Sequence, residues 1–160
     1  MTVVAVPTVH DMRSLGRRLA HVVRAGDLLV LSGDLGAGKT ALTQGIGAGL
    51  GVGGSVTSPT FVIARVHPSL GGGPPLVHVD AYRLGSLAEV DDLDLDASLE
   101  ESVTVVEWGG GLVEGLSEDR LDVEIRRSTA SDDESRQVTI TAVGPRWTAA
   151  GLGVLDFTTP

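Results

Sequence analysis

The residues best suited to chemistry lie in one short segment, "GDLGAGKT", at residues 33–40. Its glycines, Gly33, Gly36 and Gly38, allow positive φ and close backbone approach, so that successive N–H groups can surround phosphate oxygens. Lys39, the only lysine of the chain, would reach the terminal phosphates, and the Thr40 hydroxyl would ligate Mg²⁺. The spacing G-x-x-x-x-G-K-[ST] therefore predicts a phosphate-binding loop.

The segments on either side of this loop must hold it in place. The continuous apolar run "DLLVLSG" predicts a strand that is covered on both faces. After the loop, Leu42, Ile46 and Leu50 recur at helical spacing. The glycines of "GIGAGL" each weaken that helix by about 1 kcal/mol relative to alanine, so packing or a ligand must help to hold it. Strand, loop and helix in this order are the context that the phosphate-loop pattern requires.

Two acids stand where strands are expected to end. Asp80 follows "LVHV", and Glu107 follows "VTVV". Phosphoryl chemistry in this architecture needs a carboxylate beside the loop, which holds Mg²⁺ directly or through water. An ordinary solvated carboxylate explains either acid alone equally well. The loop elsewhere in the chain favours a functional role for both, and which of them contacts the metal stays open.

A further loop, "TSPTF" at residues 57–61, carries hydroxyl groups that include Thr60. Such a loop could sense a γ-phosphate as nucleotide switches do, but a proline turn capped by Ser and Thr explains it equally well. The histidines show no metal-ligand spacing, and we interpret all four as structural: His10, His21, His67 and His78. The chain has no asparagine, so the Asn-Lys-x-Asp guanine reader cannot be present, which favours ATP.

The remaining patterns indicate one mixed sheet. A strand at residues 3–6 precedes a helix that begins with the capping pair Thr8 and Asp11 and ends near Gly26. Residues 61–80 predict a hairpin, and Ser86 is expected to begin a short helix. The alternating segments "RLDVEIRR" and "RQVTITAV" predict an antiparallel pair of strands. The fold class is α/β, a three-layer fold like that of P-loop NTPases, with a mixed central sheet flanked by helices. We place a single domain at residues 1–144 and a loosely packed or flexible tail at 145–160.

Composition limits the partners and the location. The 160 residues suit one domain, and the absence of cysteine excludes disulfides and thiolate metal sites. The N-terminus lacks a charged lead before an apolar segment, and no run is long enough to span a membrane, so we expect a cytoplasmic protein. A net charge of -9 and a content of 3% aromatic residues argue against direct binding of DNA or RNA by this chain. A partner is expected to hold any nucleic acid.

Four motifs, in this order and at these separations, resemble the bacterial TsaE (YjeE) family of P-loop ATPases: "GDLGAGKT", "TSPTF", "HVDAYRL" and "VEWGGGL". The resemblance covers residues 14–143. It implies an ATPase needed for threonylcarbamoyladenosine at position 37 of tRNA, acting with the proteins TsaD and TsaB. tRNA would be met only through that complex, because TsaD transfers the threonylcarbamoyl group.

The resemblance also implies roles for individual residues. Glu107 matches the family's metal-associated acid, Asp80 its other functional carboxylate, and Thr60 its switch-like loop. Arg136 stands in the place of an arginine that can approach the nucleotide. Thr40 would bind phosphate and Mg²⁺, and the phosphate-binding loop would comprise Leu35, Gly36, Ala37, Gly38, Lys39 and Thr40.

Three functions remain as alternatives. The first is a regulatory ATPase of a tRNA-modifying assembly, with low activity alone because a lone phosphate loop needs help to complete charge stabilisation. The second is a small-molecule kinase, which would need an acceptor pocket and an arginine-bearing lid. The third is a nucleotide-binding module without turnover.

Overall fold

The computed structural model describes residues 2–33, 38–53, 64–80, 100–107, 119–127 and 135–149. Seven strands form one sheet in the order β1-β7-β6-β2-β5-β4-β3. Their bounds are β1 Thr2–Val6, β2 Leu28–Gly33, β3 Ala64–His67, β4 Leu76–Asp80, β5 Val103–Glu107, β6 Arg120–Arg127 and β7 Arg136–Val143. The helices are α1 Val9–Ala20, α2 Lys39–Leu50 and α5 Pro145–Ala149.

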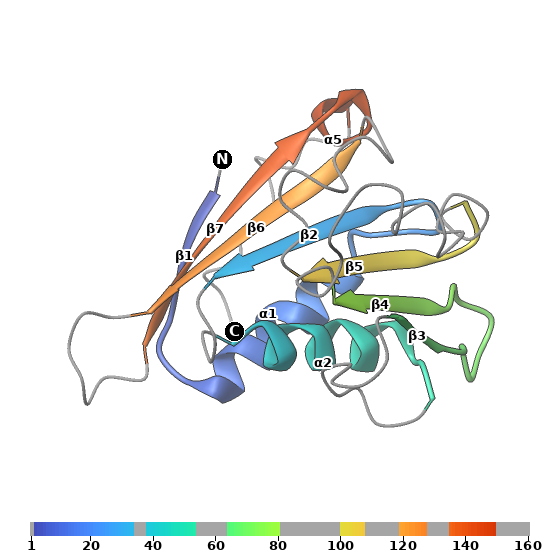
Figure 1. Ribbon diagram of the computed structural model, residues 1–160, viewed down its shortest axis with the longest axis horizontal. Helices are drawn as coiled ribbons and strands as arrows, with labels where there is room; N and C mark the ends of the chain where they lie inside the picture. Colours follow the sequence, from blue (N-terminus) through green and yellow to red (C-terminus); the bar gives the residue numbers. More distant parts are fainter. Residues whose placement is uncertain are drawn as a thin grey trace.

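The sheet is parallel at its centre and antiparallel at both margins. β2 pairs in parallel with β5 and β6, and β4 pairs in parallel with β5. β3 joins β4 as the predicted hairpin, and β6 with β7 forms the predicted antiparallel pair. β1 closes the other margin against β7. Figure 1 shows the central strands as arrows that point the same way, so their carboxyl ends share one edge of the sheet.

The first helix begins as its capping residues predict. The Thr8 hydroxyl accepts a hydrogen bond from the Asp11 backbone N–H at 3.1 Å and donates one to the Asp11 carboxylate at 2.7 Å. The predicted end of the helix was wrong, because α1 stops at Ala20 with His21 as its cap. Gly26, with φ 98°, instead turns the chain into β2, and its N–H donates to the Ser102 carbonyl at 2.9 Å.

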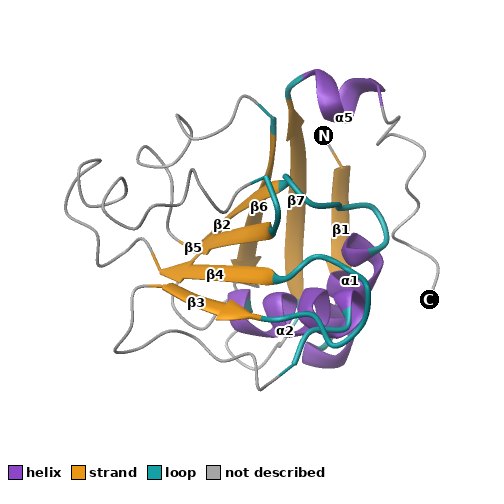
Figure 2. Ribbon diagram, turned by 90° about the vertical axis from the view of Figure 1, so that its right-hand side faces the viewer, coloured by secondary structure: helices purple, strands orange, loops and turns teal. Residues whose placement is uncertain are grey.

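The main core lies between one face of the sheet and the two long helices, which lie side by side (Figure 2). Met12, Leu15 and Leu19 of α1 are buried there with Leu42 and Ile46 of α2. The opposite face of the central strands is also buried, as expected for strands covered on both sides: Leu28, Val30, Val77, Val79 and Val106. The helix predicted from Ser86 lies outside the described residues. None of the helices in the described segments is long and apolar enough to cross a membrane.

Glycines bring the backbones of α1 and α2 into contact. A Cβ atom on Gly45 would lie 2.1 Å from the carbonyl oxygen of Arg13, and one on Gly16 would lie 2.3 Å from that of Leu42. At Gly49 the added atom would lie 2.5 Å from the Cβ of Ala20. A larger side chain at these positions would separate the two helices. The glycines that weaken α2 as an isolated helix are therefore offset by close packing against α1.

The predicted loose tail was wrong for its first residues. Pro145–Ala149 form α5, and the Trp147 side chain is fully buried in the main core. Arg146 fixes this helix through a two-pronged ion pair with the buried Asp27, at 3.0 and 3.1 Å. Its backbone N–H donates to the Asp119 carboxylate at 3.0 Å. The packed part of the chain thus continues past Gly144, and residues 150–160 lie outside the described range.

Candidate functional site

Three adjacent strands end together at the candidate site. β5 lies between β2 and β4, and all three run in the same direction. In the register of the sheet, Glu107 stands beside Leu31 of β2 and beside Asp80 of β4. Gly33 ends β2 two residues after Leu31. The sheet therefore places the two predicted acids next to each other at the edge from which the phosphate-loop segment leaves.

The helix that follows the loop begins with backbone N–H groups that have no acceptor within the helix itself. Gly38 is the N-cap of α2, with φ 117°, and as a glycine it has no side chain to cap the helix. A Cβ atom on Gly38 would also lie 3.1 Å from the Cε of Met12, so the position suits glycine on two counts. The first turn of α2 contains no acidic residue. Its N–H groups and the positive end of its dipole are arranged to receive an anion.

Lys39 stands in the first turn of α2 and is buried, with 6% of its surface exposed. Its ammonium group donates a hydrogen bond to the Gly33 carbonyl at 2.8 Å, across the loop. A buried lysine of this kind costs desolvation free energy unless its charge is compensated. Thr40 follows it and is half-buried at the same helix end. The charge and the hydroxyl predicted from the motif therefore lie together above the end of β2.

Glu107 is a buried carboxylate with spare hydrogen-bonding capacity. It is 3% exposed, and its Oε1 atom has no hydrogen-bond partner in the parts of the chain that are described. The Nε2 atom of His78 lies 3.3 Å from this oxygen, but without the alignment of a hydrogen bond. A buried carboxylate oxygen left this way is costly. The site therefore suits an additional positive charge or donor, such as a hydrated Mg²⁺ ion.

His78 lies beside Glu107 in the candidate site, although the sequence analysis did not assign it there. We predicted all four histidines to be structural, yet this one is fully buried on β4 and faces Glu107 from the neighbouring strand. Its position two residues before Asp80 was the available signal, because alternate residues of a strand share a face. The pattern became informative only once β4 and β5 were known to be neighbours.

The remaining predicted residues are placed only in part. The backbone of Asp80 ends β4 beside Glu107, whereas its side chain is outside the described residues. Arg136 begins β7, two strands from β2 in the sheet order, and is thus about 10 Å away laterally. Four predicted residues lie outside the described range: Leu35, Gly36, Ala37 and Thr60. The described segments also contain no cluster of three or more histidine or acidic residues suited to a metal ion.

Comparison with known proteins identifies the family. A family model described as "Threonylcarbamoyl adenosine biosynthesis protein TsaE" matches residues 6–138 of the chain. The chain belongs to the TsaE family.

The similarity to individual TsaE proteins extends over most of the chain. A relative from Streptomyces coelicolor, named tRNA threonylcarbamoyladenosine biosynthesis protein TsaE, is 67% identical over 146 residues, or 90% of this chain and 99% of its own. A relative of the same name from Bacillus subtilis is 41% identical over 138 residues, or 86% and 83% of the two chains. The crystal structure of Bacillus subtilis YdiB superposes with a TM-score of 0.72 and 32% identity, covering 93% of this chain and 90% of that one.

These comparisons confirm the family that the four sequence motifs indicated and the α/β fold. The sheet is mixed, as predicted, and the fold is that of the P-loop proteins. TsaE is a protein of tRNA threonylcarbamoyladenosine biosynthesis. The family and the P-loop-like fold together indicate a nucleotide-binding protein.

The contact between His78 and Glu107 predicts an energetic coupling between them. We expect His78→Leu to lower the free energy of unfolding by about 1–3 kcal/mol, because an apolar side chain would replace the imidazole that lies 3.3 Å from the buried carboxylate oxygen. In a protein that already carries Glu107→Leu, the His78→Leu substitution should lower the free energy of unfolding by much less. Urea unfolding of the two single variants and the double variant gives the coupling as a double-mutant cycle. Additive effects within about 0.5 kcal/mol would contradict an interaction between the two side chains.

Proposed function

We propose that this TsaE-family protein binds ATP with Mg²⁺ at the end of β2 and hydrolyses it in support of threonylcarbamoyladenosine formation on tRNA. The observation that carries this proposal is the arrangement of three groups at one edge of the sheet. They are the buried Lys39 side chain, the N-terminus of α2 with Gly38 as its N-cap, and the buried carboxylate of Glu107 on the strand next to β2.

The first two groups account for phosphate binding. The N–H groups of the first turn of α2 can donate to phosphate oxygens, and the helix dipole favours the negative charge of the phosphates. Lys39 is already held over the loop by its hydrogen bond to the Gly33 carbonyl. Transfer of this ammonium group from a carbonyl oxygen to the β and γ oxygens of ATP would exchange a neutral acceptor for a charged one. Turnover requires charge stabilisation of this kind as water attacks the γ-phosphorus and ADP leaves.

The acidic side of the site would hold the metal. Thr40 and Glu107 are the residues in described positions that would bind Mg²⁺ or its water ligands, with Asp80 on the neighbouring strand end as the second acid. Mg²⁺ held by these residues would supply positive charge that stabilises the phosphates during transfer. Mg²⁺ keeps several waters and phosphate ligands in such sites, so it needs few protein ligands. Sparse protein ligation at this edge is thus compatible with the metal.

The proposed partners are the proteins TsaD and TsaB. A lone phosphate-loop site hydrolyses its nucleotide slowly until another group positions water or adds positive charge. We therefore propose that ATP turnover depends on the TsaD–TsaB complex, that tRNA is met through this complex, and that the protein works in the cytoplasm. The net charge of -9 supports an indirect contact with tRNA.

The decisive experiment measures phosphate release from ATP and Mg²⁺ with and without the TsaD–TsaB complex. We expect slow release by the protein alone, stimulation by the complex, and loss of both when EDTA removes Mg²⁺. Absence of stimulation would reject the partner-dependent ATPase. The alternative small-molecule kinase would transfer phosphate to a metabolite, so ADP would form in a metabolite screen without equal release of free phosphate.

A further inference from the structure

The outer side of α1 carries a row of basic side chains. His10, Arg13, Arg17, His21 and Arg24 follow one another at intervals of three or four residues, and we call this row the arginine face. Within α1 and its cap His21, residues at this spacing share one side of the helix, and Arg24 follows in the turn beyond it. Arg13 and Arg24 are exposed, as are both histidines, and Arg17 is half-buried. The opposite side of α1 is buried in the main core through Met12, Leu15 and Leu19.

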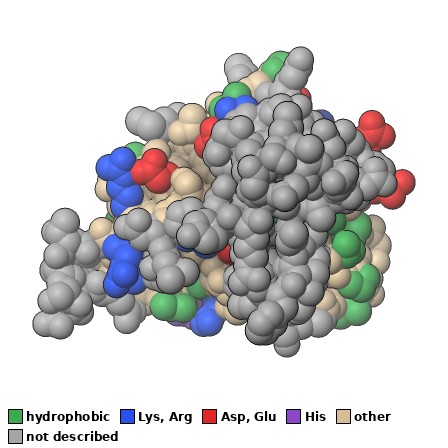
Figure 3. All heavy atoms as spheres, in the orientation of Figure 1, with side chains coloured by type: hydrophobic (Ala, Val, Ile, Leu, Met, Phe, Trp, Pro, Cys, Tyr) green, Lys and Arg blue, Asp and Glu red, His purple; other side chains and the backbone are tan. Residues whose placement is uncertain are grey.

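The surroundings of the arginine face provide little negative charge. Residues 9–26 contain four arginines and one acid, Asp11, a net charge of +3 in a chain whose total is -9. The acid is already occupied by Thr8 at the helix N-terminus. The neighbouring helix α2 has no acidic residue along its length, and its outer side presents Gln44 and Ala48. Figure 3 shows Lys and Arg side chains at several places on the visible face, between grey atoms of residues that are not described.

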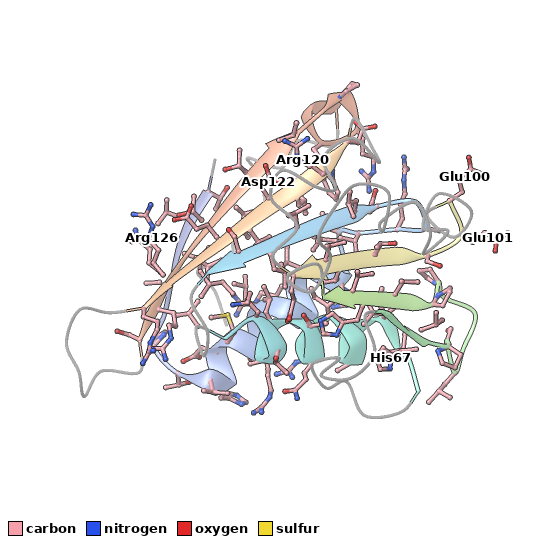
Figure 4. The ribbon with its side chains drawn as sticks, viewed as in Figure 1. His67, Glu100, Glu101, Arg120, Asp122 and Arg126 are labelled. Atoms are coloured by element: carbon pink, nitrogen blue, oxygen red, sulfur yellow. The ribbon has the colours of Figure 1, made fainter. Side chains whose placement is uncertain are left out.

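Three arginines elsewhere in the described segments are paired with acids. Arg120 contacts Asp122 at 3.0 Å on β6, and both are labelled in Figure 4. Arg126, farther along the same strand, contacts Glu124, and Arg146 contacts Asp27.

On the arginine face the hydrogen bonds go to neutral groups. Arg13 donates to the Gln44 side chain at 3.1 Å, and Arg17 donates to the Ser14 hydroxyl at 3.1 Å. None of the guanidinium groups of Arg13, Arg17 and Arg24 forms an ion pair with a carboxylate among the described residues. The only carboxylate contact of Arg24 there is its backbone N–H, which donates to the buried Asp27 side chain at 2.7 Å. This surface therefore gathers three arginines whose guanidinium groups have no described ion pair, in contrast to Arg120, Arg126 and Arg146.

Stabilisation of the helix explains only part of this row. Cations in the last turn interact favourably with the helix dipole, which accounts for Arg17 and Arg18. Arg13 stands in the middle of α1, and Arg24 lies beyond its end at Ala20. The dipole effect falls off within one turn, so it does not account for these two exposed arginines.

We propose that the arginine face is a docking surface for an acidic patch on a protein partner. Arginine forms bidentate hydrogen bonds with carboxylates and is enriched in protein interfaces. A nucleic acid is the less suitable occupant, because its affinity rests on many phosphate contacts and its extended charge would be repelled by a chain of net charge -9. No aromatic residue stands in residues 9–26 to stack on a base. A small acidic patch on a protein could contact the arginine face without approaching the acidic remainder of the chain.

This inference rests on the proposed function for the identity of the partner, the TsaD–TsaB complex. The test compares two double variants that change the net charge equally. Arg13→Glu/Arg24→Glu reverses the two exposed arginines of the face, and Arg126→Glu/Arg127→Glu reverses two exposed arginines of β6. Circular dichroism melts verify that each variant folds. Calorimetric titration then measures affinity for the TsaD–TsaB complex at low and high salt.

We expect the α1 double variant to lose at least about tenfold in affinity at low salt, because like charges then oppose each other across the interface. The β6 double variant should stay within about twofold of the parent protein, and the parent should bind more weakly at high salt. Equal affinities of the parent and the α1 variant would overturn the docking surface.

Two further outcomes separate this inference from the proposed function. If the parent protein does not bind the TsaD–TsaB complex, the proposed function fails, and retention on immobilised poly-L-glutamate then tests the face itself. Stronger retention of the parent than of the α1 variant supports an acidic protein patch, whereas equal retention rejects it. A gel shift of tRNA by the protein alone that the α1 variant loses would overturn the inference in favour of nucleic acid.

Discussion

Arginine in place of Lys39 should reduce ATP turnover nearly as much as alanine does, by at least about 100-fold. Lys39 is the only lysine among 12 Lys and Arg residues, and its side chain is 94% buried with its ammonium group 2.8 Å from the Gly33 carbonyl. A guanidinium group is planar and larger, and it presents five donors in a rigid fork. The buried position beside Gly33 accommodates a compact ammonium group on a flexible stem, so retention of positive charge alone does not restore the interaction.

The measurement is phosphate release in the presence of the TsaD–TsaB complex, together with the affinity for a fluorescent ATP analogue. Arg127→Lys is the matched control, because it exchanges the same two residue types at an exposed position of β6 and should leave turnover unchanged. Thermal unfolding verifies that the variants fold. Near-normal turnover of Lys39→Arg would show that shape does not select lysine at this position.

Glu107→Gln should abolish most turnover, by about 100-fold or more, while ATP binding survives. The substitution keeps the size of the side chain and removes its charge. Glu107 is 3% exposed, and its Oε1 atom lacks a hydrogen-bond partner among the described residues. The substitution therefore removes the only carboxylate whose side chain is described at this end of β5, beside the backbone of Asp80 on β4. Phosphate binding by Lys39 and the N-terminus of α2 does not depend on this carboxylate.

Single-turnover hydrolysis and equilibrium binding of ATP separate the two effects. Glu124→Gln, which changes a carboxylate on β6 with much greater exposure, serves as the control and should retain turnover. A Glu107→Gln protein that binds ATP but does not hydrolyse it also excludes a binding module without turnover, provided that the parent protein hydrolyses ATP. Retained hydrolysis would remove Glu107 from the catalytic site.

The elements that hold the site were predictable because their patterns are local. The apolar run before Gly33 and the helical spacing of Leu42, Ile46 and Leu50 define β2 and α2 without knowledge of their neighbours. Glu107 could be recognised in the same way, as an acid at the end of a buried strand.

Features that depend on strand order or on distant contacts were not predictable. His78 became part of the site only because β4 lies beside β5. Trp147 was assigned to a loose tail because a short segment after Gly144 has no periodicity, yet tertiary packing and the ion pair of Arg146 with Asp27 hold it in the core. Gly26 resembled a helix end, since glycine suits both a helix C-terminus and a turn before a strand.

The glycine contacts between α1 and α2 have a mechanical consequence. Two helices separated by a layer of long side chains can shift by repacking those side chains, whereas helices in backbone contact have no such layer to absorb a shift. Gly16, Gly45 and Gly49 should therefore make α1 and α2 move as one rigid body. Met12 of α1 also lies against Gly38, directly before Lys39. A load applied to the outer side of α1 would reach the start of α2 without a hinge in between.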